Sequence, residues 1–131
     1  MDRLVLPGTL STPAVDFDPD SGRLSLRGES YPEHSSEFFR PILAWLQAFL
    51  DQAGGAVSME VELTYLNTSS IKAMMDILDL LEEAHLRNRQ VSFTWYYDPE
   101  NDRALEMAEE FQEEVSLPFF VVPRRPEAPS P

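Results

Sequence analysis

Apolar and polar side chains alternate through residues 57–66, and this pattern constrains the fold more than any other feature of the sequence. The apolar side comprises Val57, Met59, Val61, Leu63 and Tyr65, and the polar side comprises Ser58, Glu60, Glu62 and Thr64. Because successive side chains of a strand point to opposite faces of its sheet, the alternation predicts a strand with one buried face and one exposed face.

A helix and a second strand are predicted directly after this strand. Residues 69–86 carry an apolar stripe with helical spacing, and residues 91–97 alternate again. The stripe comprises Ile71, Met74, Met75, Leu78, Leu81 and His85, and Ile77 and Leu80 widen it. A third helix over about residues 100–115 and a last strand over 117–122 extend the series. Strands linked through helices in this way favour a parallel sheet with right-handed crossovers.

The first part of the chain predicts a hairpin and one more helix. Turn-forming residues 18–22 separate two short strands within residues 14–30. A helix begins at Ser35 or Ser36 and ends before Gly54. Pro41 lacks the backbone N–H that a helix interior requires, so the helix either starts late or bends near Arg40.

These elements predict an α/β fold with a mixed sheet, in the order β-β-α-β-α-β-α-β. Because the two clearest strands alternate, the helices are expected to lie mainly on one face of the sheet. A chain of 131 residues suits one core. We therefore expect a single domain over residues 1–122, followed by a Pro-rich, disordered tail over 123–131.

Charge and composition exclude several classes of function. The formal net charge of −13 disfavours nucleic acid and anionic membranes as partners, and no apolar run is long enough to span a bilayer. The N-terminus lacks the features of a secretory signal. The sequence has no cysteine, which excludes thiolate catalysis and Cys-ligated metals and fits a cytoplasmic protein.

The common catalytic motifs are missing from the sequence. It has no Gly-rich phosphate loop, no Gly-x-Ser-x-Gly elbow and no His-Glu-x-x-His pair, so we predict no catalytic residue, cofactor or metal site. We expect His85 to be structural, and we expect a carboxylate-rich face around Glu106, Glu109, Glu110, Glu113 and Glu114 to be solvated. A small enzyme that uses Asp76, Asp79 or Asp98 as acid and base is the alternative of another class.

The junction after residue 66 is the one constellation with a functional interpretation. Three hydroxyl residues, Thr68, Ser69 and Ser70, follow Asn67 where the second helix begins. The unpaired backbone N–H groups and the dipole of a helix N-terminus favour an anion there. The only lysine, Lys72, lies one turn beyond Thr68. The structural alternative is that Asn67 or Thr68 serves only as the N-cap.

The same residues resemble a known protein family. The run Tyr65-Leu66-Asn67-Thr68-Ser69-Ser70-Ile71-Lys72, followed by Asp76-Ile77-Leu78, Trp95-Tyr96-Tyr97-Asp98 and Pro118-Phe119, is similar to the SiaC family of bacterial regulatory phosphoproteins. The resemblance covers about residues 8–122. It implies a STAS-like fold, similar to that of anti-sigma-factor antagonists.

The resemblance also implies a function without enzymatic activity. It implies that a cognate Ser/Thr kinase and a PP2C-type phosphatase act on the Thr of the Asn-Thr-Ser-Ser motif, which is Thr68 here, with Ser69 and Ser70 as the alternatives. The unphosphorylated form is implied to bind and activate a diguanylate cyclase, which raises cyclic di-GMP and favours biofilm formation or aggregation. An anti-sigma-factor antagonist, whose partner would be an anti-sigma kinase, is the alternative within the same fold.

A partner surface around the junction follows as a hypothesis. Asn67 and Lys72 would support the phosphate, and one of Met74 and Met75 would lie at the surface as an adaptable contact. The expected interface comprises Tyr65, Leu66, Asn67, Thr68, Ser69, Ile71, Met74 and Met75.

Overall fold

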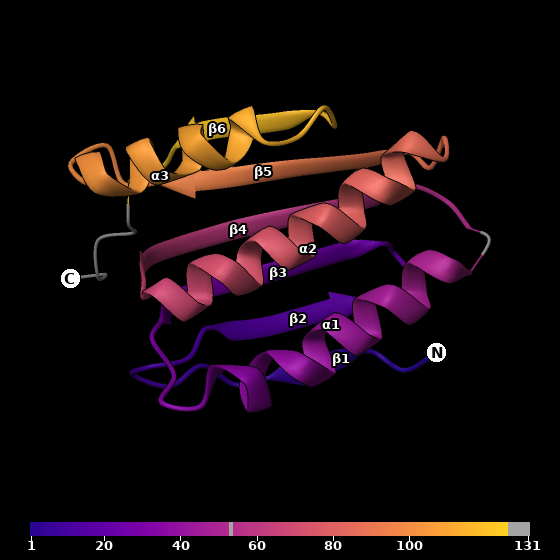
Figure 1. The fold of residues 1–131 in the computed structure, drawn as a ribbon, viewed down its shortest axis with the longest axis horizontal. Coiled ribbons are helices and arrows are strands. Elements are labelled where there is room, and N and C mark those ends of the chain that lie inside the picture. Colours follow the sequence, from indigo (N-terminus) through magenta and orange to yellow (C-terminus); the bar gives the residue numbers. More distant parts are fainter. Residues whose placement is uncertain (53, 126–131) are drawn as a thin grey trace, which may run out of the picture.

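One mixed sheet carries the helices on a single face in the computed structural model, which describes residues 1–52 and 54–125 (Figure 1). The strands are β1 (Leu4–Leu6), β2 (Ala14–Asp18), β3 (Arg23–Ser30), β4 (Val57–Leu66), β5 (Val91–Tyr97) and β6 (Phe119–Pro123). The helices are α1 (Ser35–Asp51), α2 (Thr68–Leu86) and α3 (Asp102–Glu113). The expected α/β class and the placement of the helices on one face are confirmed.

The strands lie in the sheet in chain order, from β1 to β6. The pairs β1–β2 and β2–β3 are antiparallel, and the pairs from β3 to β6 are parallel. The predicted hairpin and the predicted parallel part are therefore both present. The sequence interpretation missed β1, because three apolar residues are too few to show an alternation. β1 pairs with β2, with Leu4 opposite Phe17, and it is the first strand in the sheet order, so it forms one edge of the described sheet.

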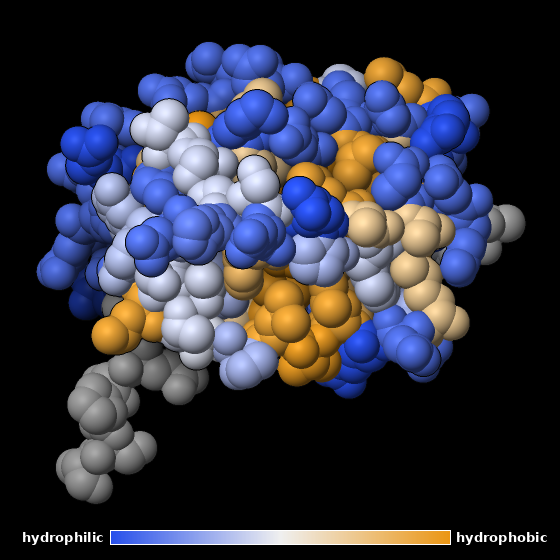
Figure 2. Space-filling model, turned by 60° about the horizontal axis from the view of Figure 1, so that its bottom comes forward, coloured by the Kyte–Doolittle hydropathy of each residue, from blue (hydrophilic) through white to orange (hydrophobic). Residues whose placement is uncertain are grey.

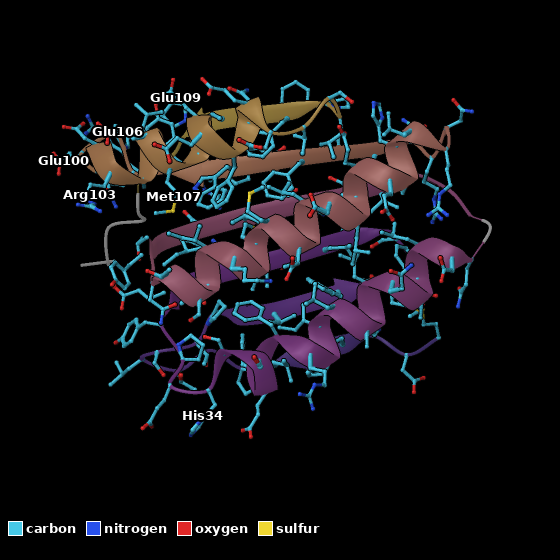
Figure 3. The ribbon with its side chains drawn as sticks, viewed as in Figure 1. His34, Glu100, Arg103, Glu106, Met107 and Glu109 are labelled. Atoms are coloured by element: carbon cyan, nitrogen blue, oxygen red, sulfur yellow. The ribbon has the colours of Figure 1, made fainter. Side chains whose placement is uncertain are left out.

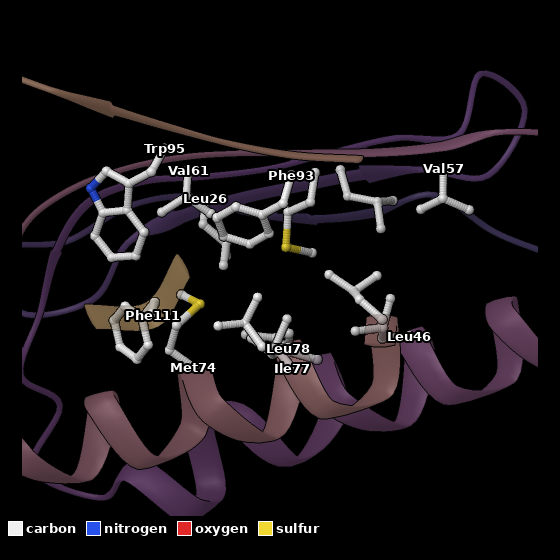
Figure 4. Close-up of a cluster of buried hydrophobic side chains, with 14 of the residues drawn as sticks. Leu26, Leu46, Val57, Val61, Met74, Ile77, Leu78, Phe93, Trp95 and Phe111 are labelled. Atoms are coloured by element: carbon white, nitrogen blue, oxygen red, sulfur yellow. The ribbon is translucent and has the colours of Figure 1, made fainter. Parts of the chain in front are cut away.

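The core lies between the sheet and its helices (Figure 4). Trp95 of β5 is fully buried and stacks on Phe111 of α3, with ring centroids 5.5 Å apart. Trp45 of α1 is half-buried and lies 5.3 Å from the ring of Phe17. Four buried side chains of β4, Val57, Met59, Val61 and Leu63, lie at positions that the alternation placed on its apolar side, and Leu66 is buried as well. The half-buried strand is confirmed for these four positions.

Helix α1 begins at Ser35 and continues through Pro41. A proline in a helix interior removes one hydrogen bond and costs about 3 kcal/mol. The buried face of α1 runs on both sides of Pro41 and comprises Phe39, Ile42, Leu46, Phe49 and Leu50. Because burial of each such side chain contributes roughly 1.5–3 kcal/mol, packing outweighs the local cost of the proline. The late-start alternative is therefore wrong.

The end of the described chain is more ordered than the sequence predicted. Pro123 is the last residue of β6, and the N–H of Arg124 donates to the carbonyl oxygen of Tyr97 at 2.7 Å. The guanidinium of Arg124 also lies over the ring of Tyr96, 3.8 Å from its centroid. The expected disordered tail therefore does not begin at Pro123. Its residues 126–131 lie outside the described residues.

The face of the sheet opposite the helices is polar and carries several ion pairs. Arg23 pairs with Glu60 at 3.2 Å, while Arg27 and Arg124 both pair with Glu62, at 3.0 and 2.7 Å. Partial burial acts to raise the pKa of Glu62, but the hydrogen bonds from the two arginines outweigh it and hold that pKa below its ordinary value. These pairs explain why the polar side of β4 is rich in glutamate.

Candidate functional site

The junction between β4 and α2 is built around Asn67. Its side-chain oxygen accepts hydrogen bonds from the N–H of Ser70 at 2.9 Å and from the hydroxyl of Ser69 at 3.1 Å. Its own N–H donates to the carbonyl oxygen of Ser30 at 2.9 Å, which ties the junction to the end of β3. Asn67 is thus the N-cap of α2, and Thr68 is its first helical residue.

The three hydroxyls after Asn67 have different environments. Ser70 is fully buried, and its hydroxyl lies 2.7 Å from that of Ser30. The hydroxyl of Ser69 contacts both Asn67 and Ser35 of α1. Thr68 is exposed, and no hydrogen bond to its side chain is found among the described residues. Of the three residues named as possible phosphorylation sites, Ser70 is therefore buried, and Thr68 and Ser69 are exposed.

Positive charge near the junction comes from the helix and from Lys72. The side chain of Lys72 is 79 % exposed, and its ammonium group lies 3.3 Å from the carboxylate of Asp76. Exposed pairs of this kind contribute about 0–1 kcal/mol, so Lys72 can exchange Asp76 for another anion. The backbone N–H groups of the first turn add the positive end of the α2 dipole.

A shallow groove of about 430 Å³ lies between α1 and α2 beside the junction. Ser69, Lys72 and Asp76 line it from α2, and Ser35 and Arg40 line it from α1. The sequence interpretation missed Ser35 and Arg40, because they precede Thr68 by about thirty residues and carry no motif. Only the packing of α1 against α2 brings them to the site.

The expected interface residues are partly exposed and partly buried. Thr68 and Ser69 are exposed, Tyr65 is 52 % exposed, and Asn67, Ile71 and Met75 are half-buried. Leu66 and Met74 are 5 % and 1 % exposed and belong to the core, so their assignment to a partner surface is wrong. Leu66 from β4 and Met74 from α2 both belong to the hydrophobic core cluster.

The exposure of Tyr65 corrects the predicted alternation of β4. The register between β3 and β4 shifts after Gly28, which pairs with Leu63, while Glu29 pairs with Tyr65. The extra residue, Thr64, reverses the alternation, so Tyr65 turns outward and Leu66 turns inward. The exposed Tyr65 ring meets the ring of Tyr31 edge-on, with centroids 5.8 Å apart.

The other candidate groups form no shared catalytic arrangement. Asp76 lines the groove and pairs with Lys72, Asp79 is exposed on α2, and Asp98 accepts a hydrogen bond from the N–H of Glu100 at 3.0 Å. The acidic side chains of α3 that were expected to be solvated, Glu106, Glu109, Glu110 and Glu113, are exposed, and Figure 3 labels two of them, Glu106 and Glu109. Among residues 1–52 and 54–125, no group of three or more His, Asp or Glu side chains is arranged to hold a metal ion. His85 is half-buried in the last turn of α2.

No helix within the described part of the chain has the length and apolarity needed to cross a bilayer.

Known proteins match this chain over nearly all of its length. The profile of the SiaC family of regulatory phosphoproteins matches residues 6–124. An uncharacterized protein of Pseudomonas aeruginosa (strain UCBPP-PA14) is 53 % identical over 121 residues, which cover 92 % of this chain and 96 % of the relative.

Solved structures agree with the sequence match. SiaC of Pseudomonas aeruginosa is 51 % identical with a TM-score of 0.89, and the match covers 95 % of this chain and all of that one. A chain in the crystal structure of the Pseudomonas aeruginosa diguanylate cyclase SiaD in complex with its activator SiaC is 52 % identical. Its TM-score is 0.90, and the match covers 92 % of this chain and 99 % of that one.

Proposed function

The chain belongs to the SiaC family of regulatory phosphoproteins, and we propose that its unphosphorylated form binds and activates a diguanylate cyclase. Phosphorylation at Thr68 blocks this activation in our proposal, and dephosphorylation restores it. Cyclic di-GMP formation would then follow the phosphorylation state of one residue.

The partner is inferred from the similarity to a complex. A chain 52 % identical to this one, matched over almost the full length of both, occurs in the structure of SiaD with its activator SiaC. A cyclase therefore has more support as the partner than the anti-sigma kinase of the alternative interpretation. The same similarity to a regulatory activator supports a chain that is not itself an enzyme.

The exposed position of Thr68 is the observation that carries the switch. The hydroxyls of Ser69 and Ser70 are hydrogen-bonded within the junction, whereas Thr68 is exposed at the first position of α2. A kinase could therefore modify Thr68 without opening the core. We propose a Ser/Thr kinase as the enzyme that adds the phosphate and a PP2C-type phosphatase as the enzyme that removes it, both acting in the cytoplasm.

Electrostatics explains how a phosphate at this position acts on a partner. Phosphorylation adds roughly −1.5 to −2 charges at neutral pH. The first turn of α2 stabilises that charge through its free N–H groups and its dipole, so the fold is retained. A cyclase surface that approaches the junction would then meet a new, strongly hydrated anion, and its binding would weaken.

Variants at Thr68 test the proposal with purified SiaD of Pseudomonas aeruginosa as the probe. Thr68→Glu should bind SiaD much more weakly than the unmodified protein, whereas Thr68→Gln, of the same shape but neutral, should retain most of the affinity. Gln90→Glu is the matched control, because it adds one negative charge at an exposed residue beside the opposite end of the sheet, where its carbonyl oxygen pairs with Val57.

Three outcomes would contradict the proposal. Failure of the unmodified protein to bind SiaD would contradict the partner. Equal binding by Thr68→Glu and Thr68→Gln would contradict the switch, and an equal loss for Gln90→Glu would show a general effect of charge.

A further inference from the structure

The groove between α1 and α2 has an apolar floor. Phe39 and Ala73 are buried at its base, and Leu43 is half-buried beside them. The α2 positions that line it, 69, 72, 73 and 76, recur at helical spacing and form one stripe that faces α1. Because Ala73 has no side chain beyond Cβ, space remains between the two helices at this point.

The rim of the groove carries more positive than negative charge. Arg40 and Lys72 flank the floor from the two helices, and Asp76 is the one carboxylate among the lining residues. Arg40 is exposed and makes no ion pair among residues 1–52 and 54–125. In a chain of net charge −13, this local excess of cations favours a partner group of negative charge.

We infer that this groove is the binding site for the cyclase, and that it binds an apolar side chain of the partner together with a neighbouring carboxylate. The apolar side chain would lie on Phe39, Leu43 and Ala73, and the carboxylate would lie between Arg40 and Lys72. This inference rests on the proposed function, because the cyclase is the partner that function names. An apolar anchor in a pocket with a charged rim is a common arrangement at protein interfaces.

The groove also explains how Thr68 controls binding. Ser69 lines the end of the groove, so a phosphate on the preceding residue lies beside it. Lys72 is four residues after Thr68, within reach on the same side of the helix, and its pair with Asp76 is exposed and weak. A phosphate on Thr68 draws Lys72 to itself and places its own charge where the partner carboxylate would lie. The phosphate on Thr68 therefore competes with the partner carboxylate for Lys72.

Charge-reversal variants test the proposed binding site directly, with SiaD as the probe. Arg40→Glu and Lys72→Glu should each lower the affinity about tenfold or more, because like charges would face the partner carboxylate. Arg87→Glu is the matched control, since it makes the same charge change at an exposed residue beyond the other end of α2. Its affinity should stay within about twofold of the unmodified protein.

A groove-filling variant gives a second, uncharged test. Ala73→Met places a flexible side chain over the apolar floor and should weaken binding while both cations remain. Its unfolding midpoint is measured beside the affinity, and the exposed Arg40 and Lys72 variants carry the test if Ala73→Met does not fold.

A double-mutant cycle tests the competition between phosphate and partner. Thr68→Glu should cost less affinity in a Lys72→Met background than in the unmodified protein, because both changes act through the same cation. Strictly additive losses would overturn the shared use of Lys72.

The two proposals fail separately. If Thr68→Glu loses binding while Arg40→Glu and Lys72→Glu bind like the Arg87→Glu control, the groove is not the binding site, and the proposed function is retained. If Arg40→Glu and Lys72→Glu lose binding while Thr68→Glu does not, the groove is retained as the binding site, and the proposed switch at Thr68 is wrong.

Discussion

The hydroxyl of Ser30 lies 2.7 Å from the hydroxyl of Ser70, and both residues are fully buried. This hydrogen bond joins the end of β3 to the first turn of α2. The carbonyl oxygen of Ser30 also accepts the N–H of Asn67, so one serine fixes both the cap and the start of the helix. The exposed position of Thr68 therefore depends on the buried hydrogen bond between Ser30 and Ser70.

Removing one of the two buried hydroxyls should destabilise the protein. Ser70→Ala leaves the Ser30 hydroxyl without its partner, and an unsatisfied buried polar group costs about 1–3 kcal/mol. We expect Ser30→Ala to cost a similar amount, and we expect the double variant to cost less than the sum of both. Unfolding in urea measures the three free energies, and strictly additive losses would contradict the paired arrangement.

Loss of the Asn67 cap should destabilise α2 itself. Asn67→Ala removes the acceptor for the N–H of Ser70 and should cost about 1 kcal/mol in the free energy of unfolding. Asn67→Asp keeps an acceptor at the same place and should retain most of the stability. Asn101→Ala is the comparison, because Asn101 caps α3 through the N–H of Ala104 at 3.0 Å. Equal stability of Asn67→Ala and Asn67→Asp would contradict the capping role.

Much of the fold could be predicted from local patterns. The alternation in β4 and β5 and the helical stripe of α2 arise because each element has one buried face, and periodicity records that face directly. The short β1 carries no such record, since Leu4, Val5 and Leu6 are all apolar. Val5 is 58 % exposed, and Figure 2, in which the bottom of Figure 1 comes forward, shows apolar patches on this side of the molecule.

The site was predictable in its sequence motif but not in its surroundings. Asn67 and Thr68 follow from capping preference and from the family resemblance. The outward turn of Tyr65 follows from the bulge opposite Gly28, a property of strand pairing that the sequence of β4 alone does not contain. The contact between Ser35 and Ser69 depends on how two helices pack, which periodicity does not specify.

The turn between β2 and β3 requires glycine at position 22. Gly22 has a φ of +74°, and a Cβ there would lie 2.2 Å from the carbonyl oxygen of Ala56. Gly22→Ala should therefore destabilise the protein by about 1–3 kcal/mol. Gly55→Ala is the control, because a Cβ at position 55 meets nothing within 4 Å. Thermal or urea unfolding measures both, and equal stability of the two variants would contradict the close approach.

The ion pairs of Glu62 should make stability depend on pH. The pKa of Glu62 is lowered in the folded protein, because its bonds to Arg124 and Arg27 outweigh the opposing effect of partial burial. A depressed folded pKa contributes stability above the ordinary value of 4.5 and loses it as the pH falls through the folded pKa. The unmodified protein should exceed Glu62→Gln in unfolding free energy at pH 7, and the difference should shrink below about pH 4.5. A difference that stays constant or widens towards acid pH would contradict this assignment.

The most direct test of the central claim uses the protein phosphorylated stoichiometrically at Thr68 and its unphosphorylated counterpart. Each is added to purified SiaD, and the rate of cyclic di-GMP formation from GTP is measured over a range of concentrations. We expect the unphosphorylated protein to stimulate the cyclase, and the phosphorylated protein to need at least about tenfold higher concentration for the same stimulation. Superimposable activation curves for the two forms would contradict the account.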